Sequence, residues 1–469
     1  MKILLINPPT ANMITTEVPS LVSEERGFNP PLGIMYIAAH LEKAGYDVKV
    51  IDADAEELNY SELTTTIRAY GPDIVGLSAM SFTLIDCMEI AKLVKSVDKD
   101  IKIFIGGPHV NIYPEETIRT PEIDYVVLGE GEFTTVDLVK NIDSIKNLKK
   151  IKGLVFKENG TVRNMGRPDL IKDLDKIYFP ARHLTPYKKY SSLLAKRSPI
   201  TTMITSRGCP FRCLFCDRPH LGKIFRARSA KNVVDEMEEC VNMGIHEFLI
   251  YDDTFTINRQ RVLDICDEIL ARKLDIGFDV RARLDTVDRE MLIKMKRAGC
   301  ERVHYGVESG NEEILKILNK GITIEQAQRI FKITKKIGID RLAYFMIGNP
   351  RETKRTIMQS IDLAIKLDPD YVHFSITTPF PATGLYFMGL REGIIKKDYW
   401  QEFAENPTRD FIPPLWEENL NRKELLEMAS LAYKRFYTRP SYVAKRLLKV
   451  RSLGELKRKL RAGLKVVKL

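Results

Sequence analysis

Three cysteines with the spacing of metal ligands stand close together near the middle of the sequence. Cys209, Cys213 and Cys216 form a Cys-x3-Cys-x2-Cys motif, and the β-branched apolar stretch ITTMIT leads into it. Three thiolates on a loop after a strand can bind three irons of a cubane iron–sulfur cluster. The fourth iron then has no protein ligand, so a substrate or a cofactor can bind to it.

A zinc site is the alternative for this motif, because His220 follows Cys216 at a spacing that would complete a set of four ligands. Structural zinc sites usually belong to small modules, whereas this motif begins a long repeating pattern, so we favour the cluster. The other four cysteines lie in helical patterns and are expected to be small buried apolar residues: Cys87, Cys240, Cys266 and Cys300.

The sequence around and after the motif predicts a partial (β/α)6 barrel over residues 196–388. Strand candidates recur at EFLIYDDTFT, GFDVRARLD, RVHYGVESG, RLAYFMIGNP and YVHFSITTPFP, with a helical stretch between successive strands. Together with the strand before the cysteines, they make six parallel units. Barrels of this kind carry their chemistry at the carboxyl ends of the strands. The polar residues expected there are Asp252, Asp253, Arg281, Arg283, Glu308, Ser309, Asn349 and Glu352.

The sequence pattern of residues 1–145 predicts a flavodoxin-like or Rossmann-like α/β domain. The apolar runs KILLIN, DVKVID, DIVGLS, IKIFIGG and DYVVLGEGE alternate with amphipathic stretches, which indicates a parallel sheet with helices on both faces. Ligands of such sheets lie at the carboxyl ends of the strands. The first strand ends in Asn-Pro-Pro and not in the Gly-x-Gly-x-x-Gly turn of a dinucleotide site. The paired Gly106 and Gly107 would let a large flat ligand approach closely, although a simple turn explains them as well.

Two further segments complete the predicted organisation. Residues 146–195 are expected to be a linker with a hairpin, because IKGLVFKENGTVRNMG carries an Asn-Gly turn signal. Residues 389–469 are expected to be a helical basic region. From Lys434 to Leu469 there are 13 basic residues and one acidic residue, a charge of +12, whereas the rest of the chain has 60 basic and 62 acidic residues.

The basic region leaves two interpretations open. Its leucines at 453, 456, 460 and 464 form one apolar stripe, which suits either a helix packed on the barrel or peripheral contact with an anionic membrane or an acidic partner. Nucleic acid is not an expected partner, because no aromatic platform accompanies the stripe. No apolar run reaches the roughly 20 residues of a membrane span, and MKILLINPPT lacks the features of a secretory signal. We therefore expect a cytoplasmic protein, with membrane association open.

These features together resemble the cobalamin-binding subgroup of the radical S-adenosylmethionine (SAM) superfamily. The cysteine motif opens six βα units, and the N-terminal domain carries NPP, PPLGIMYIAAHLEKAGYDVKVID, GGPH and LGEGE. The resemblance implies that Cys209, Cys213 and Cys216 hold a [4Fe–4S] cluster whose open iron binds SAM. The SAM contacts that it implies are Phe215 on the adenine, Asp252 and Asp253 on the amino group, Arg281 or Arg283 on the carboxylate, and Glu308 and Ser309 on the ribose.

For cobalamin, the resemblance implies a set of corrin-lining residues in the loops after the N-terminal strands: Pro8, Ser78, Met80, Ser81, Gly106, Gly107 and Glu130. The Asp-x-His-x-x-Gly motif that supplies a histidine to cobalt in other cobalamin proteins does not occur in the sequence. His109 follows the glycine pair and is not expected to replace it. Cobalamin without a histidine as lower ligand is therefore the expectation.

The function that the resemblance implies is reductive cleavage of SAM at the cluster and, with cobalamin, methylation of an unactivated carbon. Its expected partners are an electron donor of the flavodoxin or ferredoxin type and an organic, lipid or peptide substrate. One alternative is radical cyclisation, rearrangement or lipid carbon–carbon coupling on the same architecture. A more distant one is a zinc-stabilised binding protein. A methylthiotransferase is disfavoured, because the N-terminal domain has Cys87 and no second cysteine triad.

Overall fold

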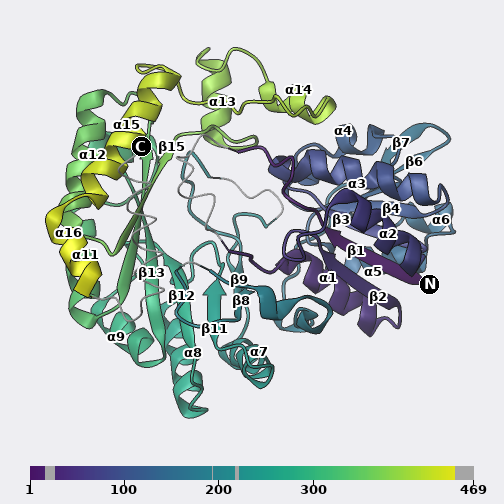
Figure 1. Cartoon of the computed structure of the whole chain (residues 1–469), viewed down its shortest axis with the longest axis horizontal. Coiled ribbons are helices and arrows are strands. Elements are labelled where there is room, and N and C mark those ends of the chain that lie inside the picture. The colour runs from purple at the N-terminus through teal and green to yellow at the C-terminus, as the bar shows by residue number, and fades with distance from the viewer. Residues whose placement is uncertain (16–26, 193, 217–220, 449–469) are drawn as a thin grey trace.

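The computed structural model describes residues 1–15, 27–192, 194–216 and 221–448, and it contains two large sheets whose strands are mostly parallel (Figure 1). Loops that follow the strands of one sheet contact loops that follow the strands of the other. Glu130, after the fifth strand of the first sheet, bonds to Arg207, and Phe82, after the third, lies edge-on to Phe380. The carboxyl ends of both sheets therefore face each other, which is where parallel sheets bind their ligands.

The first sheet has the strand order β2-β1-β3-β4-β5-β6-β7, and its first five strands are parallel. This 2-1-3-4-5 order is the flavodoxin-like one and confirms the predicted fold class. Ile3 and Leu5 of β1 pack into one buried cluster, and Leu4 and Ile6 pack into another on the opposite face. The parallel strands are β1 (Lys2–Asn7), β2 (Asp47–Asp52), β3 (Ile74–Ser78), β4 (Lys102–Gly106) and β5 (Tyr125–Val127). The helices are α1 (Leu32–Lys43), α2 (Tyr60–Tyr70), α3 (Leu84–Val97), α4 (Pro114–Arg119), α5 (Gly131–Lys140) and α6 (Ile145–Leu148).

The predicted hairpin forms, but it belongs to the first sheet rather than to a free linker. Strand β6 (Leu154–Glu158) pairs antiparallel with β5 and with β7 (Thr161–Asn164). A parallel edge strand leaves unpaired backbone groups, and the hairpin satisfies those of β5. The sheet thus extends beyond residue 145, and the connection to the second sheet begins after β7. That connection holds the short 3-10 turns η4 (Leu174–Lys176), η5 (Arg182–Leu184) and η6 (Tyr187–Lys189).

The second sheet contains six parallel strands in chain order, as predicted for a partial (β/α)6 barrel. On its outer side Val303, Phe345 and Phe374 pack into the core that the surrounding helices share. The strands are β8 (Ile200–Met203), β11 (Glu247–Ile250), β12 (Gly277–Ala282), β13 (Cys300–Glu308), β14 (Asp340–Ile347) and β15 (Tyr371–Ile376). The helices are α7 (Ala230–Asn242), α8 (Arg259–Ala271), α9 (Arg289–Arg297), α10 (Glu312–Ile317), α11 (Ile324–Ile337) and α12 (Lys354–Leu367).

The C-terminal helices split into two groups with different partners. Helices α15 (Arg422–Tyr437) and α16 (Pro440–Leu448) cover the barrel, and the Tyr433 hydroxyl donates to the Phe374 carbonyl of β15 at 3.1 Å. Helices α13 (Gly384–Arg391) and α14 (Tyr399–Glu405) instead reach the first domain, where Trp400 joins the buried cluster around α3. The leucine stripe of the basic region lies outside the described residues.

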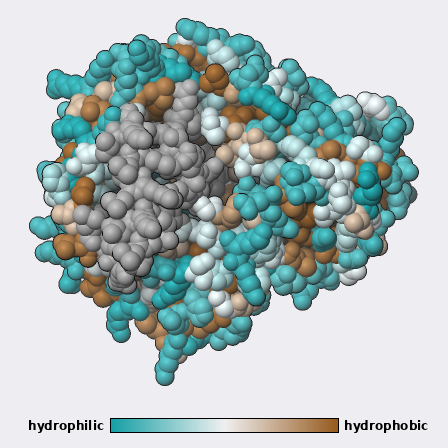
Figure 2. Space-filling view, viewed as in Figure 1, coloured by the Kyte–Doolittle hydropathy of each residue, from teal (hydrophilic) through white to brown (hydrophobic). Residues whose placement is uncertain are grey.

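Hydrophilic side chains dominate the face shown in Figure 2, and the hydrophobic ones on it are scattered. Across the part of the chain that the structure describes, no helix combines the length and the apolar character needed to cross a bilayer. The four cysteines outside the motif, at positions 87, 240, 266 and 300, are all buried, as expected.

We predict that Trp400→Ala weakens the attachment of the first domain. Trp400 is fully buried, and its indole N–H donates to the Pro379 carbonyl at 3.0 Å. Removal of a buried tryptophan side chain should cost about 3–5 kcal/mol. Urea unfolding followed by circular dichroism measures the loss, and Trp416, which is the second of two tryptophans, reports on the barrel by fluorescence. Trp400→Phe is the control and should lose much less. An unchanged midpoint for Trp400→Ala would contradict the contact.

Candidate active site

The cysteine loop is closed at its base by a small two-stranded ribbon. Strand β9 (Ser206–Arg207) pairs antiparallel with β10 (Arg226–Ala227), so the chain leaves and returns at one place. Gly208 follows β9 with a φ of 82°, and a Cβ there would lie 2.3 Å from the Ile224 carbonyl oxygen. Only glycine fits this turn, which directs the chain into the cysteines.

The three thiols lie in surroundings that suit a cluster. None is in a disulfide; Cys209 and Cys213 are half-buried, and Cys216 is exposed. The Cys209 Sγ lies 4.0 Å from the Thr254 Oγ1, and Arg283 donates to the Cys213 Sγ at 3.6 Å. Within the described ranges no three potential ligand side chains converge on a single ion. A cubane does not require convergence, because each thiolate binds its own iron. His220, the fourth ligand of the zinc alternative, lies outside the described residues.

Neighbouring segments hold the loop by its backbone. The Leu214 N–H donates to the Leu318 carbonyl at 2.9 Å, and the Leu214 carbonyl accepts from Leu385 at 2.8 Å. Phe215, predicted to flank the adenine, belongs to this loop, and the Lys320 Nζ lies 5.7 Å from the centroid of its ring. The loop is therefore fixed by segments that follow α10 and begin α13, both at the carboxyl face of the barrel.

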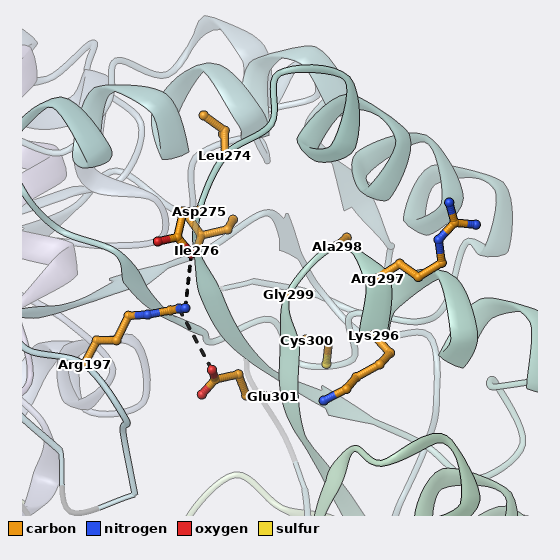
Figure 3. A pocket seen from close by; sticks show the side chains of 10 residues that line it. All are labelled: Arg197, Leu274, Asp275, Ile276, Lys296, Arg297, Ala298, Gly299, Cys300 and Glu301. Atoms are coloured by element: carbon orange, nitrogen blue, oxygen red, sulfur yellow. Dashed lines mark hydrogen bonds and ion pairs between the residues drawn. The ribbon is translucent and has the colours of Figure 1, made fainter.

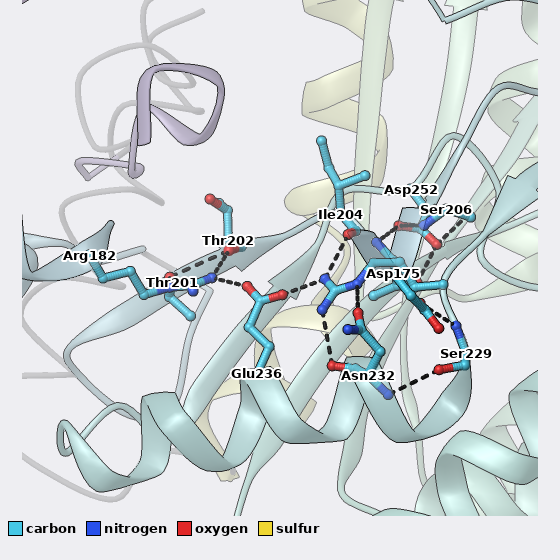
Figure 4. Close-up of polar contacts among 12 residues, drawn as sticks. Asp175, Arg182, Thr201, Thr202, Ile204, Ser206, Ser229, Asn232, Glu236 and Asp252 are labelled. Carbon is cyan, nitrogen blue, oxygen red and sulfur yellow. Dashed lines mark hydrogen bonds and ion pairs between the residues drawn. The ribbon is translucent and has the colours of Figure 1, made fainter. Parts of the chain in front are cut away.

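Asp252 joins the segment after the first barrel strand to the end of the second. Its carboxylate accepts from the backbone and hydroxyl groups of Thr205 and Ser206 at 2.5–3.1 Å, and the side chain is buried (Figure 4). These four bonds engage both oxygens, and the SAM contact expected for Asp252 stays a prediction. The half-buried Asp253 precedes Thr254, the neighbour of Cys209, and so keeps a position suitable for that contact.

The two candidate arginines on β12 and the loop after it have different surroundings. Arg283 binds both oxygens of Asp285 at 2.9 and 2.8 Å, and its guanidinium stacks on Phe211 at 3.7 Å. It therefore supports the cysteine loop. Arg281 is half-buried, lies 4.0 Å from the centroid of Tyr251, and has no ion-pair partner among the described residues. The choice between the two for the SAM carboxylate stays a prediction, and the absence of an ion-pair partner favours Arg281.

The end of β13 is similarly divided. Glu308 has a φ of 68° and bonds to the Lys320 ammonium at 2.7 Å in a buried ion pair. Ser309 is fully buried, and its hydroxyl lies 3.3 Å from that of Ser360 on α12. This burial disfavours Ser309 as a ribose contact, and that role stays a prediction. Glu308 stays a candidate for that contact.

Sequence reasoning missed a row of polar side chains along the inner side of the barrel. His304 on β13 lies 3.0 Å from the Tyr344 hydroxyl, and Tyr344 pairs across the strands with His373. Burial lowers the pKa of both histidines, so both are neutral hydrogen-bonding groups near neutral pH. The alternation of residues along these strands could have revealed the row, because the residues between them, such as Tyr305 and Phe345, face the helices.

The predicted corrin edge of the first domain is partly open. Met80 is 49% exposed, and a Cβ on Gly106 would approach nothing closer than 3.6 Å. Pro8 is buried, and Ser78 and Ser81 are half-buried at the same edge. Close packing requires a glycine at position 107, because with its φ of 102° a Cβ would lie 2.7 Å from the Ala79 carbonyl oxygen, and its place at the corrin stays a prediction. This glycine lets the loops after β3 and β4 pack together.

His109 and Glu130 are both buried inside the protein. His109 is buried, its Nδ1 lies 3.0 Å from the Ser81 hydroxyl, and burial lowers its pKa to about 3. It is therefore placed as a core residue and not as a ligand on an open face. Both oxygens of Glu130 bond to arginines of the second domain, which disfavours it as a corrin-lining residue, a role that stays a prediction.

A cavity elsewhere in the barrel is not part of this site. It has a volume of about 280 Å³ and is lined by Arg197, Asp275, Glu301 and the segment before β13 (Figure 3). These residues stand at the amino ends of the strands, opposite to the cysteine loop. Residues at that end of a barrel contribute to stability rather than to chemistry.

Comparisons with known proteins agree with this arrangement. Residues 20–139 match the B12 binding domain, and residues 203–364 match the Radical SAM superfamily. An uncharacterized methyltransferase of Pyrococcus horikoshii is 37% identical over 95% of this chain and 94% of its own length. The chain belongs to the radical SAM superfamily and carries a B12-binding domain. It is therefore a radical SAM enzyme, and its cofactors are a [4Fe–4S] cluster, SAM and cobalamin.

Two other matches support the architecture. An anaerobic magnesium-protoporphyrin IX monomethyl ester cyclase of Cereibacter sphaeroides is 30% identical over 88% of this chain and 68% of its own. The solved structure of the cobalamin-dependent SAM radical enzyme OxsB, with aqua-cobalamin and SAM bound, superposes with a TM-score of 0.75 at 19% identity. It covers 99% of this chain and 72% of OxsB. At that identity the likeness concerns the fold.

We predict that Gly107→Ala destabilises the radical SAM enzyme through its B12-binding domain. A left-handed φ and a backbone oxygen at 2.7 Å leave no room for a methyl group, so the cost should be roughly 2 kcal/mol or more. Gly33→Ala is the control, because Gly33 lies in α1 with nothing within 4 Å, and it should be neutral or stabilising by up to about 1 kcal/mol. Urea denaturation measures both. Equal stabilities of the two variants would show that the close approach to Ala79 does not matter.

Proposed function

We propose that this radical SAM enzyme is a cobalamin-dependent methyltransferase that acts on an unactivated carbon. The observation that carries the proposal is the facing of the two carboxyl edges, one with the cysteine loop and the other with the open corrin edge. A substrate between them would reach both cofactors. The similarity to the Pyrococcus horikoshii methyltransferase over both domains supports the same conclusion.

The described residues fit the cofactors. Cys209, Cys213 and Cys216 would hold the cluster, with Arg283 close to the Cys213 sulfur to offset its negative charge. Arg281, Asp253, Glu308 and Phe215 would contact SAM, and Met80, Ser78, Ser81, Gly106 and Pro8 would line the corrin. When bound, the cluster and SAM together supply hydrogen abstraction from the substrate, and cobalamin supplies the methyl group.

The residues of the chain itself position these groups and exclude water. Arg283 is fixed by Asp285 and by the Lys320 carbonyl at 2.6 Å, so it holds the cysteine loop at one distance from the barrel. His304, Tyr344 and His373 line the inner side of the barrel with neutral hydrogen-bonding groups. We propose that they bind polar groups of the substrate, since a neutral imidazole can donate or accept without the cost of a buried charge.

Radical cyclisation is the second candidate function. The cyclase of Cereibacter sphaeroides shares both domains with this chain at 30% identity, so the architecture alone does not separate methylation from ring formation. Transfer of a labelled methyl group from SAM separates the two. With cobalamin reduced to the Co(I) state and no substrate, a methyltransferase should transfer the labelled methyl group from SAM to the cobalt and release S-adenosylhomocysteine. An enzyme that cleaves SAM but takes up neither cobalamin nor label would favour the second candidate.

The finer expectations about partners stay predictions. The enzyme needs an electron donor, which we propose to be a flavodoxin or ferredoxin. A peripheral contact of the basic segment after residue 448 with an anionic membrane is likewise a proposal, supported by its charge. Binding of the full chain to vesicles with and without anionic lipid tests it, and equal binding to both would contradict it.

We predict that Cys213→Ala abolishes the cluster and SAM cleavage but leaves the fold. Loss of one of three thiolates should leave the iron too weakly held to survive anaerobic desalting. Iron, acid-labile sulfide and deoxyadenosine are the quantities to measure after anaerobic reconstitution. Cys266→Ala is the control, since this cysteine is a buried residue of α8, and the variant should keep iron, sulfide and deoxyadenosine release. Full deoxyadenosine release by Cys213→Ala, or one zinc and no iron in the wild type, would overturn the assignment.

A further inference from the structure

Two buried arginines stand at the base of the cysteine loop, and both bond to the B12-binding domain. The Arg207 Nη1 donates to one oxygen of Glu130 at 2.8 Å, and the Arg226 Nη1 donates to the other at 2.7 Å. Arg207 belongs to β9 and Arg226 to β10, where the two are paired directly across the ribbon. A single carboxylate thus joins the outgoing and the returning ends of the loop.

Glu132 completes the charge balance of this group. It accepts from the Arg207 Nη2 at 2.5 Å, so two carboxylates face two guanidinium groups. All four side chains are at most 7% exposed. The group also includes the segment after the hairpin, because the Ile171 N–H donates to Glu130 and its carbonyl accepts from Arg226. Buried ions of this kind depend on every partner being in place.

The position of these residues connects the two cofactor regions. Glu130 precedes α5 at the carboxyl edge of the first sheet, and Arg207 lies two residues before Cys209. The loop is held at its far side by Leu318 and Leu385 of the barrel region, and at its base by Glu130 and Glu132 of the other domain. The barrel alone therefore does not fix the loop.

We propose that Glu130 and Glu132 are positioning residues that hold the cluster-binding loop in the geometry needed to retain the cluster and to bind SAM at it. The proposal rests on the proposed role of Cys209, Cys213 and Cys216. Loss of the Glu130 charge leaves Arg226 as a buried cation without a carboxylate partner, whereas Arg207 keeps Glu132. Loss of the Glu132 charge leaves both arginines with Glu130. Glu130→Gln should therefore be the more damaging change.

The test uses the full chain, reconstituted anaerobically with iron and sulfide. Iron per chain and the rate at which a chelator removes it are measured for the wild type, Glu130→Gln and Glu132→Gln. For Glu130→Gln we expect removal to be faster by on the order of tenfold or more, with a smaller increase for Glu132→Gln. The electron paramagnetic resonance spectrum of the reduced cluster should also lose its response to added SAM, a change that lower overall stability would not produce.

Two further variants separate positioning from general destabilisation. Asp370→Asn breaks a comparable buried pair with Arg341 on the outer side of the barrel, at 3.0 Å, and should lower the melting temperature while the cluster is retained. Glu130→Gln combined with Arg226→Met removes the unpaired cation but does not restore the tie to the first domain, so it should regain much of the thermal stability while it still loses iron faster than the wild type.

Each outcome decides one claim. If Glu130→Gln loses iron no faster than Asp370→Asn and keeps the spectral response to SAM, the positioning role is wrong. If the double variant retains iron as well as the wild type does, the unpaired Arg226 and not the lost tie causes the iron loss, and the positioning role of Glu130 is wrong. If Cys213→Ala retains iron in the same assay, the cysteine assignment fails, and this is distinguishable because it does not involve Glu130.

Discussion

Buried charge at the junction of the two domains is the constraint on which this architecture depends. Arg207 and Arg226 are removed from water by the packing of one domain on the other, and an unpaired buried guanidinium costs several kcal/mol. Their partners come from a loop of the first sheet about 75–95 positions earlier in the chain. In the orientation observed all four charges are paired, so the electrostatics of the junction favour the arrangement in which the two carboxyl edges face each other.

Much of the polar chemistry near the cysteines supports the site rather than forming it. Asp252 ties β8 to β11, Arg283 braces the cysteine loop against Asp285, and Ser309 is bonded inside the protein to α12. Each uses its bonding capacity on the protein, so the strand ends and the loop are held rigidly before any ligand binds. Precise positioning of this kind keeps reacting groups within the narrow range that catalysis requires.

The fold could be predicted from the sequence because buried parallel strands are continuous apolar runs with helices between them. The cysteine spacing, together with the order of the domains, also predicted the radical SAM family. The roles of Asp252, Arg283 and Glu130 could not be predicted, because a position at a strand end does not say which way the side chain points or which distant residue it meets. His304, Tyr344 and His373 were missed for the opposite reason. They lie within strands, and a search limited to the ends of strands does not include side chains on the inner side of an open barrel.

An open barrel explains why the first domain and the C-terminal helices belong to the same site. Six strands do not close, and the unpaired edges of β8 and β15 must be covered. On one side the Ile200 N–H donates to the Tyr190 backbone carbonyl, and the Tyr190 hydroxyl donates to the carboxylate of Asp52 in the first sheet at 2.8 Å. On the other side the backbone N–H of Trp416 donates to the backbone carbonyl of Thr377, which follows β15. Trp400 then joins this region to the first domain. Covering the edges with the partner domain keeps the inner side of the barrel accessible to a substrate, which closure by two more strands would not.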